Sequence, residues 1–204
     1  MTVRQASRLD QLADRWWTLA ASGYDQAAAL VGWHRRQDAL VRDITSGLVL
    51  DVGCGPAHLA PGLLARGAGY VGVDRNAAMV SRARRRVASW PGRGMVVRAD
   101  ITALPFHGKS FDIVVATGVL GLLDLRSRRA ALRELARVTS REVRLLEPVC
   151  RPGAPPRTTR SRLIAFVRDR PIDLTELAEA GLEPEVCGPP WLAGVYSVVR
   201  ATRR

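Results

Sequence analysis

The ten residues VLDVGCGPAH, at positions 49–58, constrain the fold of this 204-residue chain more than any other stretch. Their apolar beginning is typical of a buried strand, and a glycine-rich turn and the start of a helix follow. A turn of this kind holds anionic groups of nucleotide-like cofactors, because the first backbone N–H groups of a helix have no partner within it. The stretch therefore predicts a cofactor loop inside an α/β fold.

Two ligand classes use such a loop. The dinucleotide pattern G-x-G-x-x-G would start at Gly53 and Gly55, but its third glycine falls on His58, where helix and strand must pack closely. The pattern D-x-G-x-G-x-G fits better, with Asp51 first and Ala57 as a small replacement for the last glycine. That pattern is suited to the methionine end of S-adenosylmethionine (SAM), so we expect SAM rather than NAD.

Apolar runs and helical periodicities alternate along the chain. This alternation predicts an α/β protein with a mostly parallel sheet and helices on both faces. We expect strands at 48–52, 70–74, 94–100, 111–117 and 142–148, and helices at 57–66, 76–88, 126–138 and 174–182. Two closing strands are expected in the segments EPEVC and GVYSVVRATR, paired as a hairpin.

Polar residues stand where the predicted strands end. Asp74 ends the second strand, 23 residues after Asp51, where a carboxylate can accept hydrogen bonds from ribose hydroxyls. Asp100 ends the third strand, where it could meet an adenine amino group, and the segment 116–120 follows the fourth strand. Because ligands of open α/β sheets bind beyond the carboxyl ends of the strands, we expect these groups to share one site.

Together these motifs, in this order, resemble the class I SAM-dependent methyltransferases over residues 47–147, and the rest of the chain more loosely. The resemblance implies methyl transfer and a Rossmann-like, seven-stranded sheet whose last strand is antiparallel. It also implies that a tyrosine upstream of the first strand closes over the cofactor. The residues that it assigns to cofactor binding are Tyr24, Asp51, Gly53, Cys54, Gly55, Asp74, Arg75, Met79, Asp100, Ile101 and Thr117.

We interpret residues 1–204 as one methyltransferase domain. Residues 1–46 would form a helical cap, whose helices between 8 and 44 we expect to act as a lid. Residues 47–147 would form the SAM-binding core, and 148–204 a substrate-side loop, a helix and the closing strands. The proline- and arginine-rich segment 150–162 is expected to be a surface loop, followed by a short helix through Val167.

Composition limits the partners. The formal net charge is +12, but 30 of the 31 basic residues are arginine, a bias typical of a GC-rich genome, so a nucleic-acid partner is possible without being favoured. No apolar run is long enough for a membrane span, and no signal peptide is evident, which favours a cytoplasmic protein. The three cysteines form no zinc-binding pattern, so we expect no metal.

The methyl group of SAM is already activated, so the protein mainly has to align the acceptor and exclude water. If the acceptor must lose a proton, His34 is the best candidate base. After the fourth strand stands ATGVLGLL, an apolar wall without the N/D-P-P-Y/F/W motif of amino methylation. This wall favours a small-molecule acceptor such as a secondary metabolite, a quinone or a lipid.

An RNA or protein methyltransferase is the alternative, and a SAM-binding protein without transfer activity is a third possibility. The sequence leaves the acceptor, the methylated atom and the oligomeric state open.

Overall fold

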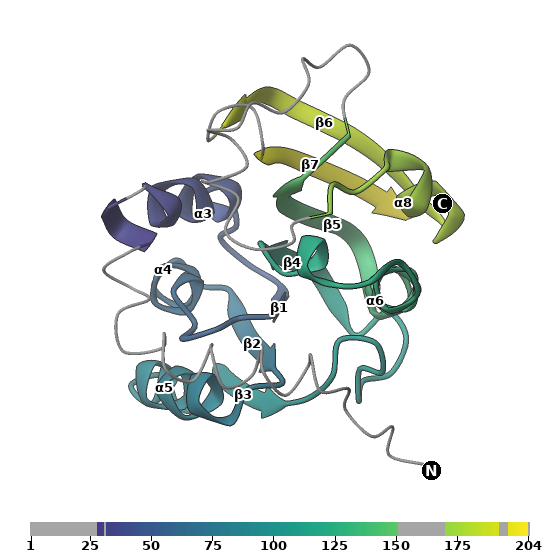
Figure 1. The fold of residues 1–204 in the computed structure, drawn as a ribbon. Helices are drawn as coiled ribbons and strands as arrows, with labels where there is room; N and C mark the ends of the chain where they lie inside the picture. The colour runs from purple at the N-terminus through teal and green to yellow at the C-terminus, as the bar shows by residue number, and fades with distance from the viewer. Residues whose placement is uncertain (1–27, 31, 151–169, 192–195, 204) are drawn as a thin grey trace.

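The computed structural model describes residues 28–30, 32–150, 170–191 and 196–203, which form one seven-stranded sheet with helices on both faces (Figure 1). The sheet order is β3-β2-β1-β4-β5-β7-β6, and only β7 runs antiparallel to its neighbours. The strands are β1 (Leu48–Val52), β2 (Gly69–Asp74), β3 (Gly94–Arg98), β4 (Phe111–Thr117), β5 (Thr139–Pro148), β6 (Leu182–Trp191) and β7 (Tyr196–Arg203). The predicted Rossmann-like sheet with one antiparallel strand is confirmed.

The predicted closing hairpin is also confirmed as β6 and β7. Only residues 192–195 separate the two strands, too few for the crossover that a parallel pair would need. β6 contains Pro184, Pro189 and Pro190, which cannot donate to a neighbouring strand. Its position at the edge of the sheet accommodates them, because one side of an edge strand needs no ladder of hydrogen bonds.

The helices form two layers. On one face lie α3 (Trp33–Val41), α4 (Leu59–Ala65) and α5 (Ala77–Val87); on the other lie the short 3₁₀ helix η1 (Leu120–Leu122), α6 (Leu125–Val138) and α8 (Leu174–Glu179) (Figure 1). Side chains between sheet and helices form two apolar clusters, one on each face. The helices predicted after β1, β2 and β4 and before β6 are therefore all present, although α8 is shorter than expected.

The strand order reverses between β1 and β4, which are neighbours although two strands come between them in sequence. The first half of the sheet grows from β1 toward β3, and the second half from β4 toward β6. Connections leave the two strands in opposite directions here, and ligands of open α/β sheets bind beyond the carboxyl ends of the strands at such a point. The cofactor loop follows β1 and the apolar segment follows β4, and the two pack together through Gly53 and Val119 at this rim of the sheet.

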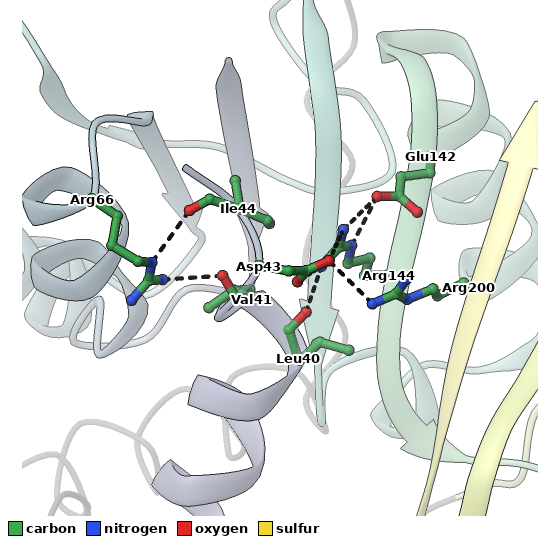
Figure 2. Close-up of polar contacts among 8 residues, drawn as sticks. All are labelled: Leu40, Val41, Asp43, Ile44, Arg66, Glu142, Arg144 and Arg200. Carbon is green, nitrogen blue, oxygen red and sulfur yellow. Dashed lines mark hydrogen bonds and ion pairs between the residues drawn. The ribbon is translucent and has the colours of Figure 1, made fainter. Parts of the chain in front are cut away.

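Helix α3 is fixed at its C-terminal end by a buried arginine from β5 (Figure 2). The Arg144 side chain is 4% exposed and donates a hydrogen bond to the backbone oxygen of Leu40, at 2.8 Å. It also pairs with the carboxylates of Asp43 and Glu142, and Arg200 of β7 reaches Asp43 at 3.3 Å. The hydrogen bond from Arg144 holds the pKa of Asp43 below its ordinary value.

A second arginine, Arg66 at the C-terminal end of α4, holds the same end of α3. Arg66 donates hydrogen bonds to the backbone oxygens of Val41, at 3.0 Å, and Ile44, at 3.2 Å (Figure 2). The last carbonyl groups of a helix lack partners and carry partial negative charge, so guanidinium groups stabilise them. Val41 and Ile44 are buried in the same apolar cluster as Trp33. In this structure α3 packs into the core, and its role as a lid stays a prediction.

Some predictions lie outside the described residues: Tyr24, the cap before residue 28, and most of the segment 150–162 with its following helix. Cys150, the first residue of that segment, is exposed beyond the end of β5. None of the helices in the described part of the chain is long and apolar enough to cross a membrane. Among the described residues, no three His, Cys, Asp or Glu side chains come together as metal ligands.

Candidate cofactor site

The loop after β1 turns sharply through three left-handed residues. Gly53 has a φ of 66°, Gly55 of 52° and Ala57 of 59°. Glycine adopts this conformation without strain, whereas the Cβ of alanine comes too close to the neighbouring carbonyl oxygen and makes it unfavourable. Ala57 thus keeps the backbone path that a third glycine would take. A Cβ built on Gly55 would meet no atom of the described residues within 4 Å, so none of these residues blocks the approach of a ligand to the backbone there.

Asp74, at the end of β2, connects this loop with the start of α5. Its Oδ2 accepts a hydrogen bond from the N–H of Gly55, at 2.9 Å, and its Oδ1 accepts one from the N–H of Asn76, at 2.8 Å. Asn76 in turn caps α5 by accepting the N–H groups of Ala78 and Met79. The predicted ribose ligand therefore lies beside the glycine loop and also orders it.

Asp51 lies beneath the loop rather than on its open side. It is 2% exposed, and its Oδ2 accepts a hydrogen bond from the Tyr70 hydroxyl at 2.8 Å. Burial raises the pKa of Asp51 to about 7, against the opposing effect of the Tyr70 bond. The neighbouring Cys54 thiol is buried too, and burial together with the charges of Asp51 and Asp74 raises its pKa. Cys54 is thus kept as a thiol that packs under the loop.

Gly72 leaves the room for this buried group. A Cβ on Gly72 would lie 2.9 Å from both the Cys54 sulfur and the Tyr70 hydroxyl oxygen. Gly72 stands opposite Asp51 in the pairing of β1 with β2. The glycine in the middle of the strand is therefore explained by close packing under the cofactor loop.

The residues expected around an adenine divide into two groups. Met79 and Ile101 are buried, at 3% and 7% exposure, whereas Arg75 and Asp100 are exposed. β3 ends at Arg98, two residues before Asp100, contrary to the expected strand over 94–100. The Asp100 carboxylate accepts hydrogen bonds from the Thr102 N–H and hydroxyl, and so begins a turn. Their predicted roles at the adenine stay predictions.

Thr117, at the end of β4, is held by a glutamine of α3. The Gln37 side chain donates a hydrogen bond to the Thr117 hydroxyl at 2.8 Å, and both residues are buried. The Oε1 of Gln37 contacts Nδ1 of His34 at 3.2 Å, which makes Nδ1 the donor. In the neutral ring the lone pair is then on Nε2. Sequence reasoning missed Gln37, although a polar residue on the apolar side of a helix was the available signal.

The His34 ring stacks on His58, with ring centres 3.8 Å apart, instead of standing as an exposed polar group. His58 immediately precedes α4, and its side chain caps no N–H of that helix. It contacts Asp38 of α3 at 3.2 Å instead. Burial and the nearby His34 lower the pKa of His58, although Asp38 acts in the opposite direction. The pair joins α3 to the end of the glycine loop, and the role of His34 as a base stays a prediction.

The segment after β4 packs against the glycine loop. A Cβ on Gly53 would lie 2.6 Å from Cγ2 of Val119, so Val119 fills the space that Gly53 leaves. Gly118 has a φ of 65°, and a Cβ there would lie 3.0 Å from the Trp33 ring. The buried Glu147 of β5 accepts hydrogen bonds from three N–H groups of this segment. Sequence reasoning missed Glu147, whose signal was a single acid in the apolar run RLLEPV.

Comparison with known proteins agrees with this geometry. Residues 49–142 match the model of a family described as a methyltransferase domain. The chain is 33% identical over 143 residues to a demethylmenaquinone methyltransferase of Clavibacter sepedonicus, covering 70% of this chain and 54% of that protein. It is 43% identical over 96 residues to a malonyl-[acyl-carrier protein] O-methyltransferase of Halorhodospira halophila, covering 46% of this chain and 32% of that one. The chain thus spans about half or less of the length of these relatives.

Solved structures share the fold. Magnesium protoporphyrin IX methyltransferase of Synechocystis, solved with bound S-adenosylhomocysteine (SAH), superimposes with a TM-score of 0.62 at 18% identity, covering 100% of this chain and 90% of that one. The [4+2]-cyclase SpnF superimposes with a TM-score of 0.65 at 18% identity, covering 84% of this chain and 80% of that chain. One neighbour is named as a methyltransferase and the other as a cyclase, so the fold by itself does not define the reaction.

The sheet, the glycine loop and the domain match define a class I SAM-dependent methyltransferase fold. Residues 49–142 match that family's methyltransferase domain. The site fits the family's cofactor. Asp74 is half-buried beside the glycine loop, and its carboxylate accepts the Gly55 N–H. The prediction of SAM as the cofactor is supported by the match to the methyltransferase domain.

Proposed function

We propose that this protein transfers the methyl group of SAM to an apolar small-molecule acceptor. The observation that carries the proposal is the meeting of the glycine loop, Asp74 and the apolar segment after β4 at one rim of the sheet. SAM supplies an activated methyl group, so the protein needs no strong catalyst beyond alignment and exclusion of water. We assign the glycine loop to the methionine end, Asp74 to the ribose and the segment 117–121 to the wall beside the methionine.

The acceptor class follows from the surface near that wall. Leu122 and Leu125 are 38% and 44% exposed where η1 passes into α6. Exposed leucines close to a cofactor crevice favour an apolar acceptor over a polar one. Demethylmenaquinone is the acceptor named for the relative that covers 70% of this chain, and a malonyl carrier thioester for the second. We propose a quinone-like ring as the first acceptor class to examine.

The test has two stages. Calorimetric titration should show binding of SAM and SAH and none of NAD. Tritium from methyl-labelled SAM should then be transferred to a reduced naphthoquinone that lacks the ring methyl group, but not to a malonyl thioester. Binding of NAD instead of SAM would overturn the cofactor assignment.

SAM binding without transfer to any member of a broad acceptor panel would favour a non-catalytic role or another reaction. Retention on heparin at physiological salt, with methylation of RNA, would favour the nucleic-acid alternative.

A further inference from the structure

Glu147 is a buried carboxylate near the end of β5, and no role in the predicted site was assigned to it. It is 0% exposed. Its Oε1 accepts hydrogen bonds from the N–H groups of Val119, at 2.8 Å, and Leu120, at 3.0 Å, and its Oε2 accepts that of Gly121, at 3.2 Å. We propose that Glu147 is a positioning residue that presses the segment after β4 against the glycine loop and so shapes the cofactor site. This inference rests on the proposed function.

A carboxylate suits this place because of the turn that it serves. Val119 precedes η1, and Leu120 and Gly121 are its first residues. The first N–H groups of any helix lack partners inside it and carry partial positive charge. Three such groups, buried together, would cost free energy without an acceptor. A single negative group with two oxygens satisfies all three at once.

The turn is also held from other sides. The N–H of Gly118 donates to the backbone oxygen of Leu146 at 3.0 Å, and the Trp33 ring packs on Gly118. The N–H of Arg170 donates to the backbone oxygen of Gly121 at 2.9 Å. Arg128 in turn holds Arg170 by donating a hydrogen bond to the Arg170 backbone oxygen. The Arg128 side chain also forms a buried ion pair with Glu176. Glu147 supplies the side-chain contacts at the centre of this arrangement.

The link to the cofactor runs through Val119. Its side chain occupies the space where a Cβ of Gly53 would stand, so movement of Val119 moves the floor of the glycine loop. The same loop donates the Gly55 N–H to Asp74. A buried charge is rarely the most stabilising choice for a core position, but it can fix one arrangement over its alternatives. Glu147 therefore acts on the cofactor through the packing of Val119 against Gly53, without touching the cofactor itself.

The experiment measures SAH affinity by calorimetry, since SAH binding needs no knowledge of the acceptor. Glu147→Ala should weaken SAH binding about tenfold, the effect of losing a hydrogen-bonded arrangement of this kind. Glu147→Gln preserves the shape and one acceptor oxygen, so it should fold and show a smaller loss, about threefold. The matched control is Glu142→Gln, at the other end of β5, whose carboxylate pairs with Arg144; SAH affinity should stay unchanged.

Two further measurements separate positioning from general stability. Val119→Ala combined with Glu147→Gln should weaken SAH binding less than the sum of the single changes, because both act through one contact. Amide hydrogen exchange at residues 119–121 should speed up in Glu147→Gln without SAH, and not in Glu142→Gln.

Equal SAH affinity of Glu147→Gln, Glu147→Ala and the wild type would overturn the inference while leaving the proposed function intact. So would additive effects of the two substitutions. Failure of the wild type itself to bind SAH would overturn the proposed function, and with it any role of Glu147 at a cofactor.

Discussion

Gln37 and Thr117 lie 80 residues apart in the sequence, yet the glutamine amide donates a hydrogen bond to the threonine hydroxyl at 2.8 Å. The bond joins α3 to the end of β4, at the rim of the sheet where the reversal of strand order lies. We predict a coupling of about 1 kcal/mol between Gln37→Leu and Thr117→Val in the free energy of unfolding. Urea denaturation of the four proteins of the cycle measures it. Thr117→Ser keeps the hydroxyl and should show most of the wild-type stability.

Asp74 orders the glycine loop and is our proposed ribose ligand, so its removal has two consequences. Asp74→Ala should weaken SAM binding by about ten- to a hundredfold, because a charged acceptor of hydrogen bonds is lost from a half-buried site. Asp173→Ala serves as the control, since Asp173 likewise accepts backbone N–H bonds at the start of a helix, α8. It should lower stability and leave SAM affinity unchanged. Calorimetry together with thermal unfolding distinguishes these outcomes.

The buried Asp51 predicts an unusual dependence of stability on pH. Its pKa is about 7 in the folded protein against 3.8 for an unperturbed aspartate. Between pH 3.8 and about pH 7, the folded state keeps a proton on Asp51 that the unfolded chain has released. The contribution of Asp51 to stability is therefore complete below pH 4, falls as the pH rises through this window, and is lost above pH 7.

Asp51→Asn cannot ionise, and its amide oxygen can still accept the Tyr70 hydroxyl. It should therefore gain stability relative to the wild type between pH 5 and pH 8, by an amount on the order of 2–4 kcal/mol. Urea denaturation of the variant and the wild type at pH 5 and at pH 8 measures this difference in stability. A constant difference between variant and wild type across this range would show that Asp51 is already ionised in the folded protein.

Arg144 is the buried anchor of α3, and Arg144→Met should destabilise the protein by about 2–3 kcal/mol. The methionine fills similar space but removes the donor to the Leu40 carbonyl and the ion pairs with Glu142 and Asp43, of which Asp43 keeps only the exposed Arg200. Hydrogen exchange should increase over residues 33–44 more than in β1. Arg200→Met removes the exposed partner of Asp43 and should cost much less. Equal losses in the two variants would contradict the anchoring role of Arg144.

Local patterns sufficed to predict the elements that hold the site. The alternation of apolar strands and helices led to the sheet, and the glycine spacing from Gly53 to Ala57 led to the cofactor loop, because strand and turn preferences are encoded over a few residues. Asp74 was found because it ends a strand next to β1. Even the single antiparallel strand was expected, from the family resemblance of the motifs.

By itself, then, the sequence determined the class of fold, the glycine loop and the place of Asp74 at the end of β2. The tertiary structure decided what surrounds them: Gln37 on Thr117, Arg144 under α3, His58 beside Asp38, and Glu147 beneath the turn after β4. It also decided that α3 packs against the sheet as part of the core. These contacts join residues up to 104 positions apart. Which polar side chain meets which backbone group over such distances depends on the packing of the whole sheet, and no local pattern encodes that packing.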